Sequence, residues 1–225
     1  GTNSSPWGAY NYPIDFGWNT SVSQNIFTAE AINHGECSIE KLRYIYKTLT
    51  SDYPSVIDTE PIKIWIANTT QSSLAADDGY WIPFDQFTLV YDGIPTLTSG
   101  VDQELIFDRN APFTYNGANL CIMVERALSD NAFINHFNFE GSSLADGDVR
   151  ARLYGNYDTA FDFELPTTAE NQTGMTLGHI GDVALGINSN DGGSLAGTIT
   201  NTDAATITGA KVSIAGTDLV TFSTE

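Results

Sequence analysis

Apolar and polar residues alternate along most of this chain. The pattern is clearest at residues 120–125, where Leu120, Ile122 and Val124 occupy every second position. The same period of two recurs at Ile62–Ile66 and at Phe87–Tyr91. Successive side chains of a β-strand point to opposite faces, so each segment predicts a strand with one buried face. No long stretch has the period of about 3.6 residues that marks an amphipathic helix.

Turn-forming residues separate these segments. Residues 115–119 form a predicted tight turn around Gly117, which tolerates positive φ, and Asp92-Gly93 is a second turn signal. Pro112 is predicted to end the pairing of the strand that begins near Leu105, because proline has no N–H to donate. Further strands are predicted at 38–46, 149–153 and 161–165, the last ending at Pro166. The chain is therefore predicted to be all-β, with its strands in a two-sheet sandwich.

The predicted domain boundaries follow changes in composition. Residues 1–166 form the sandwich, and 167–193 form a linker rich in Thr, Asn and Gly with one short strand near 182–187. Residues 194–225 contain mostly small residues and predict three short strands with glycine turns. A segment this short does not bury a core alone, since chains below roughly 40 residues usually need additional support.

Charge narrows the range of partners. The chain has 9 Lys and Arg against 28 Asp and Glu, a formal net charge of −19 at pH 7. Nucleic acid and anionic membrane surfaces are therefore poor partners. No apolar run approaches the roughly 20 residues that span a bilayer, so no membrane span is expected. The few lysines and the many Thr, Ser, Asn and Gly favour an extracellular or cell-surface location.

The search for catalytic chemistry leads to the expectation that the chain is not an enzyme. His34, His136 and His179 are far apart and lie in no metalloprotease motif, and residues 192–197, GGSLAG, do not match a serine hydrolase elbow. No cofactor is required by any motif. Calcium is the best candidate ligand, at Asp146 and Asp148 or at Asp77 and Asp78. The alternative is that these Asp and Gly residues simply form turns.

Three further groups of residues have two interpretations each. Cys37 and Cys121 either form a disulfide or remain as two buried thiols. Trp65 points away from the aliphatic face of its strand, so it packs on a second layer or stands exposed for ligand binding together with Tyr80 and Trp81. The basic residues Lys41, Arg43 and Lys47 share one strand and are expected to pair with carboxylates on neighbouring strands rather than to form an anion site.

Residues 20–165 contain five blocks in a fixed order: SQNIFTAEAI, CSIEKLRYIY, IKIWIANTTQSSL, WIPFDQFTLVYDG and APFTYNGANLCIMVE. In this order they resemble a β-sandwich module of secreted and cell-surface proteins of Bacteroidota that use the type IX secretion route. Such modules are similar to cleaved-adhesin and jelly-roll modules, so the resemblance implies a jelly-roll-like sandwich. Asp158-Thr159-Ala160 matches the acceptor pattern for O-glycosylation in these bacteria, which implies a modified Thr159.

The C-terminal segment GTITNTDAATITGAKVSIAGTDLVTFSTE is similar to the opening of a carboxypeptidase-regulatory-like domain. This resemblance implies a partial immunoglobulin-like sandwich in residues 194–225. Completion by another chain would be donor-strand pairing along an open sheet edge and would make the protein a polymerising subunit.

Two functions are compatible with these observations. The first is a non-catalytic adhesion or structural module of a larger or polymerising surface protein, whose partners are other modules or copies of itself that bind along sheet edges. The second is a carbohydrate-binding module with Trp65, Trp81 and Tyr80 as the glycan platform. Exposure of the aromatic side chains on one face favours the second function, and their burial counts against it.

Overall fold

The structure is a computed structural model, and it describes residues 12–48, 56–57, 61–100, 103–129, 137–176, 178–188, 211–213 and 220–222. The chain divides into two compact units, Gly1–Asn190 and Asp191–Glu225. In the second unit, β15 (Lys211–Ser213) pairs antiparallel with β16 (Val220–Phe222). The rest of the predicted immunoglobulin-like segment lies outside the described residues.

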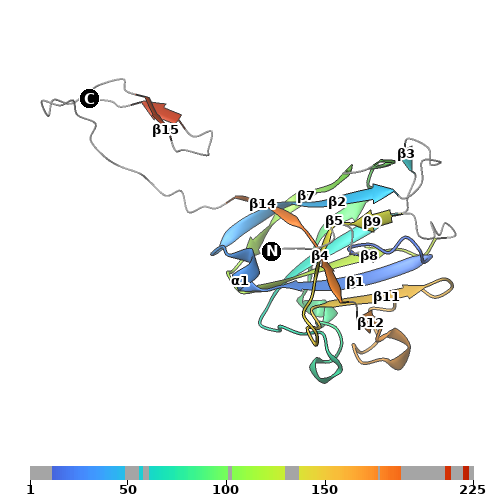
Figure 1. Cartoon of the computed structure of the whole chain (residues 1–225). Helices are drawn as coiled ribbons and strands as arrows, with labels where there is room; N and C mark the ends of the chain where they lie inside the picture. The colour runs from blue at the N-terminus through green and yellow to red at the C-terminus, as the bar shows by residue number, and fades with distance from the viewer. Residues whose placement is uncertain are drawn as a thin grey trace, which may run out of the picture. The chain divides into compact units, whose positions relative to one another are not determined.

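The first unit is built on two large antiparallel sheets (Figure 1). The larger sheet has the order β12-β11-β1-β8-β4-β5. Its strands are, in that order, Met175–Thr176, Ala151–Asn156, Thr20–Phe27, Asn119–Arg126, Ile62–Thr69 and Thr88–Gly93. The smaller sheet has the order β14 (Ala184–Asn188), β2 (Cys37–Thr48) and β7 (Gln103–Tyr115), and β9 (Phe137–Phe139) also pairs with β2.

Short elements complete the unit. β10 (Gly141–Ser143) pairs with β13 (His179–Gly181), and β3 (Val56–Ile57) pairs with β6 (Leu97–Thr98). The helical elements are all single turns: α1 (Ala29–Ile32) and the 3₁₀ turns η1 (Ala76–Asp78), η2 (Phe84–Gln86) and η3 (Glu170–Gln172).

The chain passes repeatedly between the two sheets. β1 belongs to the larger sheet, β2 to the smaller, β4 and β5 to the larger, β7 to the smaller and β8 to the larger. Strands that are hydrogen-bonded neighbours therefore come from distant parts of the sequence. This arrangement confirms the predicted all-β, two-sheet, jelly-roll-like sandwich.

The alternating apolar residues fill the space between the sheets. Leu120, Ile122 and Val124 of β8 lie in one buried cluster with the isoleucines of β4 and with aromatic residues of β2, β7 and β9. Burying apolar surface contributes roughly 25 cal/mol per Å², which makes this cluster the main source of stability. The opposite face of β8 carries Cys121 and Met123, which are also buried. They lie beneath the loops that follow β4 and β11.

Three local predictions differ from the structure. Residues 167–193 are not a linker over most of their length, because β12, β13 and β14 pair with β11, β10 and β2 of the sandwich. The predicted strand at 161–165 is a series of turns. Pro112 does not end its strand: β7 runs past it, and pairing with β2 shifts register between Asp108 and Phe113 and then continues.

Candidate functional site

The predicted glycan-binding aromatics belong to one aromatic cluster on the outer face of the larger sheet. Trp65 comes from β4, and Tyr80 and Trp81 come from the loop after η1. Trp81 is only 1% exposed, and its indole Nε1 donates a hydrogen bond of 2.9 Å to the carbonyl oxygen of Gln172. Its ring meets that of Phe161 edge to face, with centroids 5.4 Å apart. Trp81 therefore anchors two loops to the sheet, and its burial counts against the predicted role in glycan binding.

Tyr80 is held by the buried side chain of Arg152 on β11. The guanidinium carbon lies 4.8 Å from the centre of the Tyr80 ring, a cation–π distance. Arg152 also donates from Nε to the carbonyl of Leu74 at 2.9 Å and from Nη1 to the carbonyl of Thr173. Burial lowers the pKa of Arg152, but a guanidinium remains protonated at neutral pH. This side chain ties both loops to the sheet, so Tyr80 forms part of the framework.

Trp65 is less enclosed than Trp81. It is half-buried, and its ring centre lies 5.7 Å from that of Phe163. Its cross-strand partner Leu89 is 48% exposed. Two residues before Trp65 on β4, Nζ of Lys63 lies 4.0 Å from Oε2 of Glu125 on β8. Burial is the main cause of the raised pKa of Glu125. Trp65 therefore lies beside an exposed apolar side chain and a pair of charged groups.

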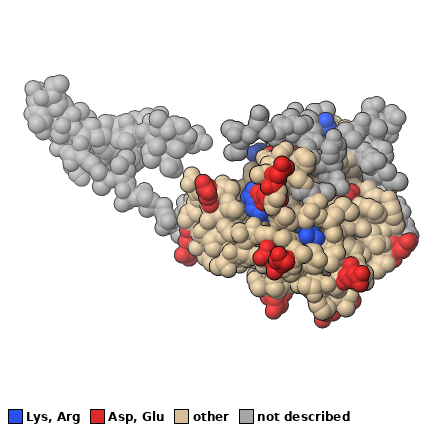
Figure 2. Space-filling model, turned by 60° about the horizontal axis from the view of Figure 1, so that its bottom comes forward, with Lys and Arg blue, Asp and Glu red and all other residues tan. Residues whose placement is uncertain are grey.

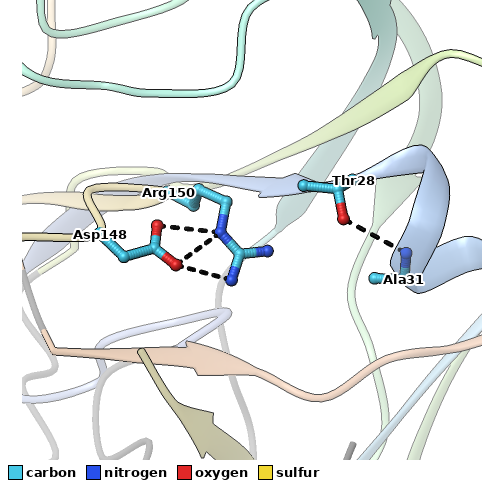
Figure 3. Close-up of polar contacts among 4 residues, drawn as sticks. All are labelled: Thr28, Ala31, Asp148 and Arg150. Carbon is cyan, nitrogen blue, oxygen red and sulfur yellow. Dashed lines mark hydrogen bonds and ion pairs between the residues drawn. The ribbon is translucent and has the colours of Figure 1, made fainter. Parts of the chain in front are cut away.

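The two acidic loops are placed as turns. Asp148 accepts two hydrogen bonds of 2.9 Å from Nε of Arg150 and forms an ion pair of 2.8 Å with its Nη2 (Figure 3). Asp146 is exposed, as are Asp77 and Asp78 in η1. Within the described ranges, no three His, Cys, Asp or Glu side chains are grouped to hold a metal ion. A calcium ion at Asp148 would have to displace a bidentate arginine.

The two cysteines are free thiols, and both are buried. Cys121 lies on the outer face of β8 with Ile26, Leu74 and Ile82, whereas Cys37 belongs to the cluster between the sheets. A sheet thus separates the two sulfur atoms, so the disulfide interpretation is wrong and the buried-thiol interpretation holds. Burial raises the pKa of both thiols.

Other predicted residues are placed as follows. Lys41 pairs with Asp108 at 2.8 Å and Arg43 pairs with Glu104 at 2.7 Å, which confirms cross-strand pairing for these two bases. Thr159 lies in an exposed turn, where the side chain of Asn156 accepts hydrogen bonds from the backbone N–H groups of Asp158 and Thr159. His136 lies outside the described residues. In the described chain, none of the helices has the length and apolar character that crossing a membrane requires.

An apolar groove that the sequence analysis missed lies between α1 and β14. Its volume is about 260 Å³, and it is lined by Phe27, Ala31, Ile32, His34, Val183, Leu185 and Ile187. Thr28 caps α1 by accepting a hydrogen bond from the backbone N–H of Ala31 (Figure 3). The only sequence signal for the groove was the alternation of Val183, Leu185 and Ile187, in a segment predicted to be a linker with one short strand.

Acidic side chains are scattered over the face of the molecule shown in Figure 2, with few basic groups among them.

Comparison with known proteins finds no family model that matches the chain and no curated protein similar enough to count as a relative. The resemblance to Bacteroidota surface modules therefore remains a prediction from the sequence.

Proposed function

We propose that this chain is a non-catalytic adhesion or structural module that acts through contacts along the edges of its sheets, within a larger or polymerising extracellular protein. The observation that carries the proposal is the position of the exposed apolar residues. Each edge strand of the two large sheets carries one such residue. In the larger sheet they are Met175 on β12, 42% exposed, and Leu89 on β5, 48% exposed. In the smaller sheet they are Ile187 on β14, 40% exposed, and Ile106 on β7, 42% exposed.

The central strands differ from these edge strands. Among their described residues, β11, β1, β8, β4 and β2 carry no exposed large apolar side chain. An edge strand presents unpaired N–H and C=O groups, and proteins that remain alone usually protect such edges with charge, proline or a cover. β7 is protected in this way, by Pro112 and by the charged residues Glu104 and Asp108, whereas β12 and β14 contain neither a charged residue nor a proline. Exposed apolar groups on edges without such protection favour the opposite outcome, which is pairing with another chain.

The extracellular location, the relation to type IX secretion and the modification of Thr159 belong to this same proposal. They are supported by the acidic composition, the block order and the exposed turn that carries Thr159. Calcium at Asp146 or at Asp77 and Asp78 is compatible with the exposure of these carboxylates. Calcium is not needed for the edge contacts.

The test is the assembly state of the protein in its native cell fraction, measured by native mass spectrometry and negative-stain microscopy. We expect the chain in particles well above its own mass of 24.4 kDa. Replacing the four edge residues with lysine should reduce that assembly, because charge at an edge opposes strand pairing. Lysine at Leu128, Tyr157 and Leu165, which are exposed but lie outside the strands, is the matched control. A free particle of 24.4 kDa contradicts the proposal.

Glycan binding at Trp65 is a second candidate function, because a half-buried Trp beside Lys63 and Glu125 combines a stacking surface with hydrogen-bonding groups. It predicts glycan-array binding that disappears in Trp65→Ala and persists in Trp18→Ala. Trp18 is also half-buried, but it packs against Tyr157 instead. Binding that both variants retain, or no binding at all, rules this candidate out.

A further inference from the structure

The groove between α1 and β14 is open to solvent although its walls are mostly apolar, with His34 as the polar side chain in its lining. Phe27, Ile32, Val183 and Leu185 are partly buried and pack against the main core, so they form a fixed floor. Ile187 also lines the groove and remains 40% exposed. Water in contact with this surface is unfavourable, and covering it would gain roughly 25 cal/mol per Å².

The size of the groove argues against a small molecule. Pockets for drug-sized ligands are usually about 300 to 1,000 Å³ and enclose most of the ligand. This groove holds about 260 Å³ and is open along one side. A space of this kind takes one or two aliphatic side chains from a larger partner.

The groove adjoins an unpaired strand edge. β14 is the terminal strand of the smaller sheet, and within the described residues it pairs with β2 alone. Val183, Leu185 and Ile187 all line the groove. They are every second residue, as expected for one face of an extended chain. A strand added to the free edge would place every second side chain over the same groove. This is the arrangement of strand addition, in which main-chain hydrogen bonds supply affinity and pockets for alternate side chains supply specificity.

Three acidic residues lie on or next to the elements that form the groove, and this acidic surrounding is called its rim. Glu30 lies on α1, Asp182 precedes Val183, and Glu40 accepts a hydrogen bond from Asn188 at the end of β14. All three side chains are exposed, and none belongs to the ion pairs found among the described residues. The nearby base Lys41 pairs with Asp108 instead. A partner with Lys or Arg beside its apolar residues would complement this rim.

A second copy of this chain fits the rim poorly. Two copies would each bring a net charge of −19. The chain does contain an alternating basic and apolar segment, at Lys41–Lys47, but that segment is the middle of β2, which is hydrogen-bonded on both sides. It is therefore unable to join the edge of another molecule without unfolding its own sheet.

From these observations we propose that the groove and the free edge of β14 together bind an extended, cationic segment of a partner polypeptide by strand addition. Alternate aliphatic side chains of that segment enter the groove, and its Lys or Arg side chains face Glu30, Glu40 and Asp182. This inference rests on the proposed function, because it assigns one of the sheet edges a partner of defined chemistry.

The test uses the full chain and a fluorescein-labelled peptide, Lys-Val-Lys-Val-Thr-Val-Lys-Val-Lys, with fluorescence anisotropy as the measurement. We expect saturable binding that weakens as salt screens the acidic rim. The same peptide with Glu in place of each Lys should not bind. The variant Ile187→Lys should weaken binding by about tenfold or more, because it places a cation at the groove.

The matched control is Leu165→Lys, since Leu165 is 37% exposed and lies in a turn outside the strands. Its binding should stay within about twofold of the unmodified chain. Equal loss in both variants overturns the proposal, because binding would then follow charge alone. Both variants are checked by circular dichroism, and Leu185→Ala provides a second groove variant that keeps the charge constant.

Other occupants give different results. If the groove is filled by another part of this chain, β14 amides are protected from hydrogen exchange in the free protein and no peptide binds. If a second copy fills it, sedimentation shows a dimer that Ile187→Lys dissociates, again without peptide binding. Either result overturns this inference while leaving the proposed function in place. A chain that is a free monomer in its native fraction overturns the proposed function, whatever the peptide does.

Discussion

At the scale of single residues, burial decides what each aromatic side chain does. Trp81 and Trp65 both lie in the aromatic cluster on the outer face of the larger sheet. Trp81 is enclosed and hydrogen-bonded, whereas Trp65 is half-buried. The same residue type therefore acts as a loop anchor in one place and as part of an open surface in the other.

We expect Trp81→Ala to lower the free energy of unfolding by about 3–5 kcal/mol, through lost packing and an unsatisfied carbonyl at Gln172. Trp65→Ala should cost about 1–2 kcal/mol, because less surface is lost from the core. Urea unfolding followed by circular dichroism measures both values. Equal costs would mean that Trp81 is less enclosed than the structure indicates.

The cysteines give a second prediction at this scale. Because both thiols are free and buried, we expect neither to react quickly with an aromatic disulfide reagent in the folded protein. After denaturation without reductant, both of the chain's 2 cysteines should react. Cys37→Ser allows Cys121 to be followed alone. Absence of reactive thiols in the denatured, unreduced protein would contradict this placement.

At the scale of elements, the loops over the larger sheet depend on close backbone approach. Gly174 has φ +64°, and a Cβ there would collide with the carbonyl oxygen of Leu153 and come within 3.0 Å of the Trp81 ring. The glycine therefore allows the segment before β12 to lie directly on β11.

We expect Gly174→Ala to destabilise the fold by about 2 kcal/mol or more, from the strained φ and the overpacking. Gly178→Ala is the matched control, because a Cβ there meets no atom within 4 Å. It should change stability by less than about 0.5 kcal/mol. Thermal unfolding of the two variants side by side gives the comparison. Similar losses in both would show that the collision at Gly174 is not the cause, because the lower entropy of the unfolded chain after Gly→Ala favours folding.

At the scale of the whole molecule, buried neutral groups make stability depend on alkaline pH. Burial raises the pKa of Cys121, Tyr44 and Tyr12 above their values in an unfolded chain. These groups are neutral in the folded state. Their contribution to the free energy of unfolding is therefore fully present below the unfolded pKa values of roughly 8.5 for Cys and 10 for Tyr. This contribution is lost as pH rises above those values, because the groups then ionise in the unfolded state before they ionise in the folded state.

We therefore expect the free energy of unfolding to fall above about pH 8.5, by up to roughly 1.4 kcal/mol per pH unit for each group that titrates. Cys121→Ala should remove part of the slope below about pH 10 and leave the tyrosine part above it. Urea unfolding at a series of pH values measures the slopes. A stability that is constant through this range would show that these groups are not buried as neutral species.

The sequence by itself determined the class of fold and much of the core. Alternation at Leu120–Val124 and at Ile62–Ile66 is enough to identify strands and their buried faces, because a period of two depends only on local backbone geometry. Cross-strand pairing of Lys41 and Arg43 was predictable for the same reason. Composition also determined the strong negative charge.

Only the tertiary structure decided what lies next to what. Phe161 and Phe163 alternate with charged residues as in a strand, yet they reach the same aromatic cluster from a series of turns. Cys37 and Cys121 are separated by a sheet, and the stretch predicted as a linker supplies β14 and one wall of the groove. Local patterns identify strands but not their partners, because pairing and burial are set by contacts between residues far apart in the chain.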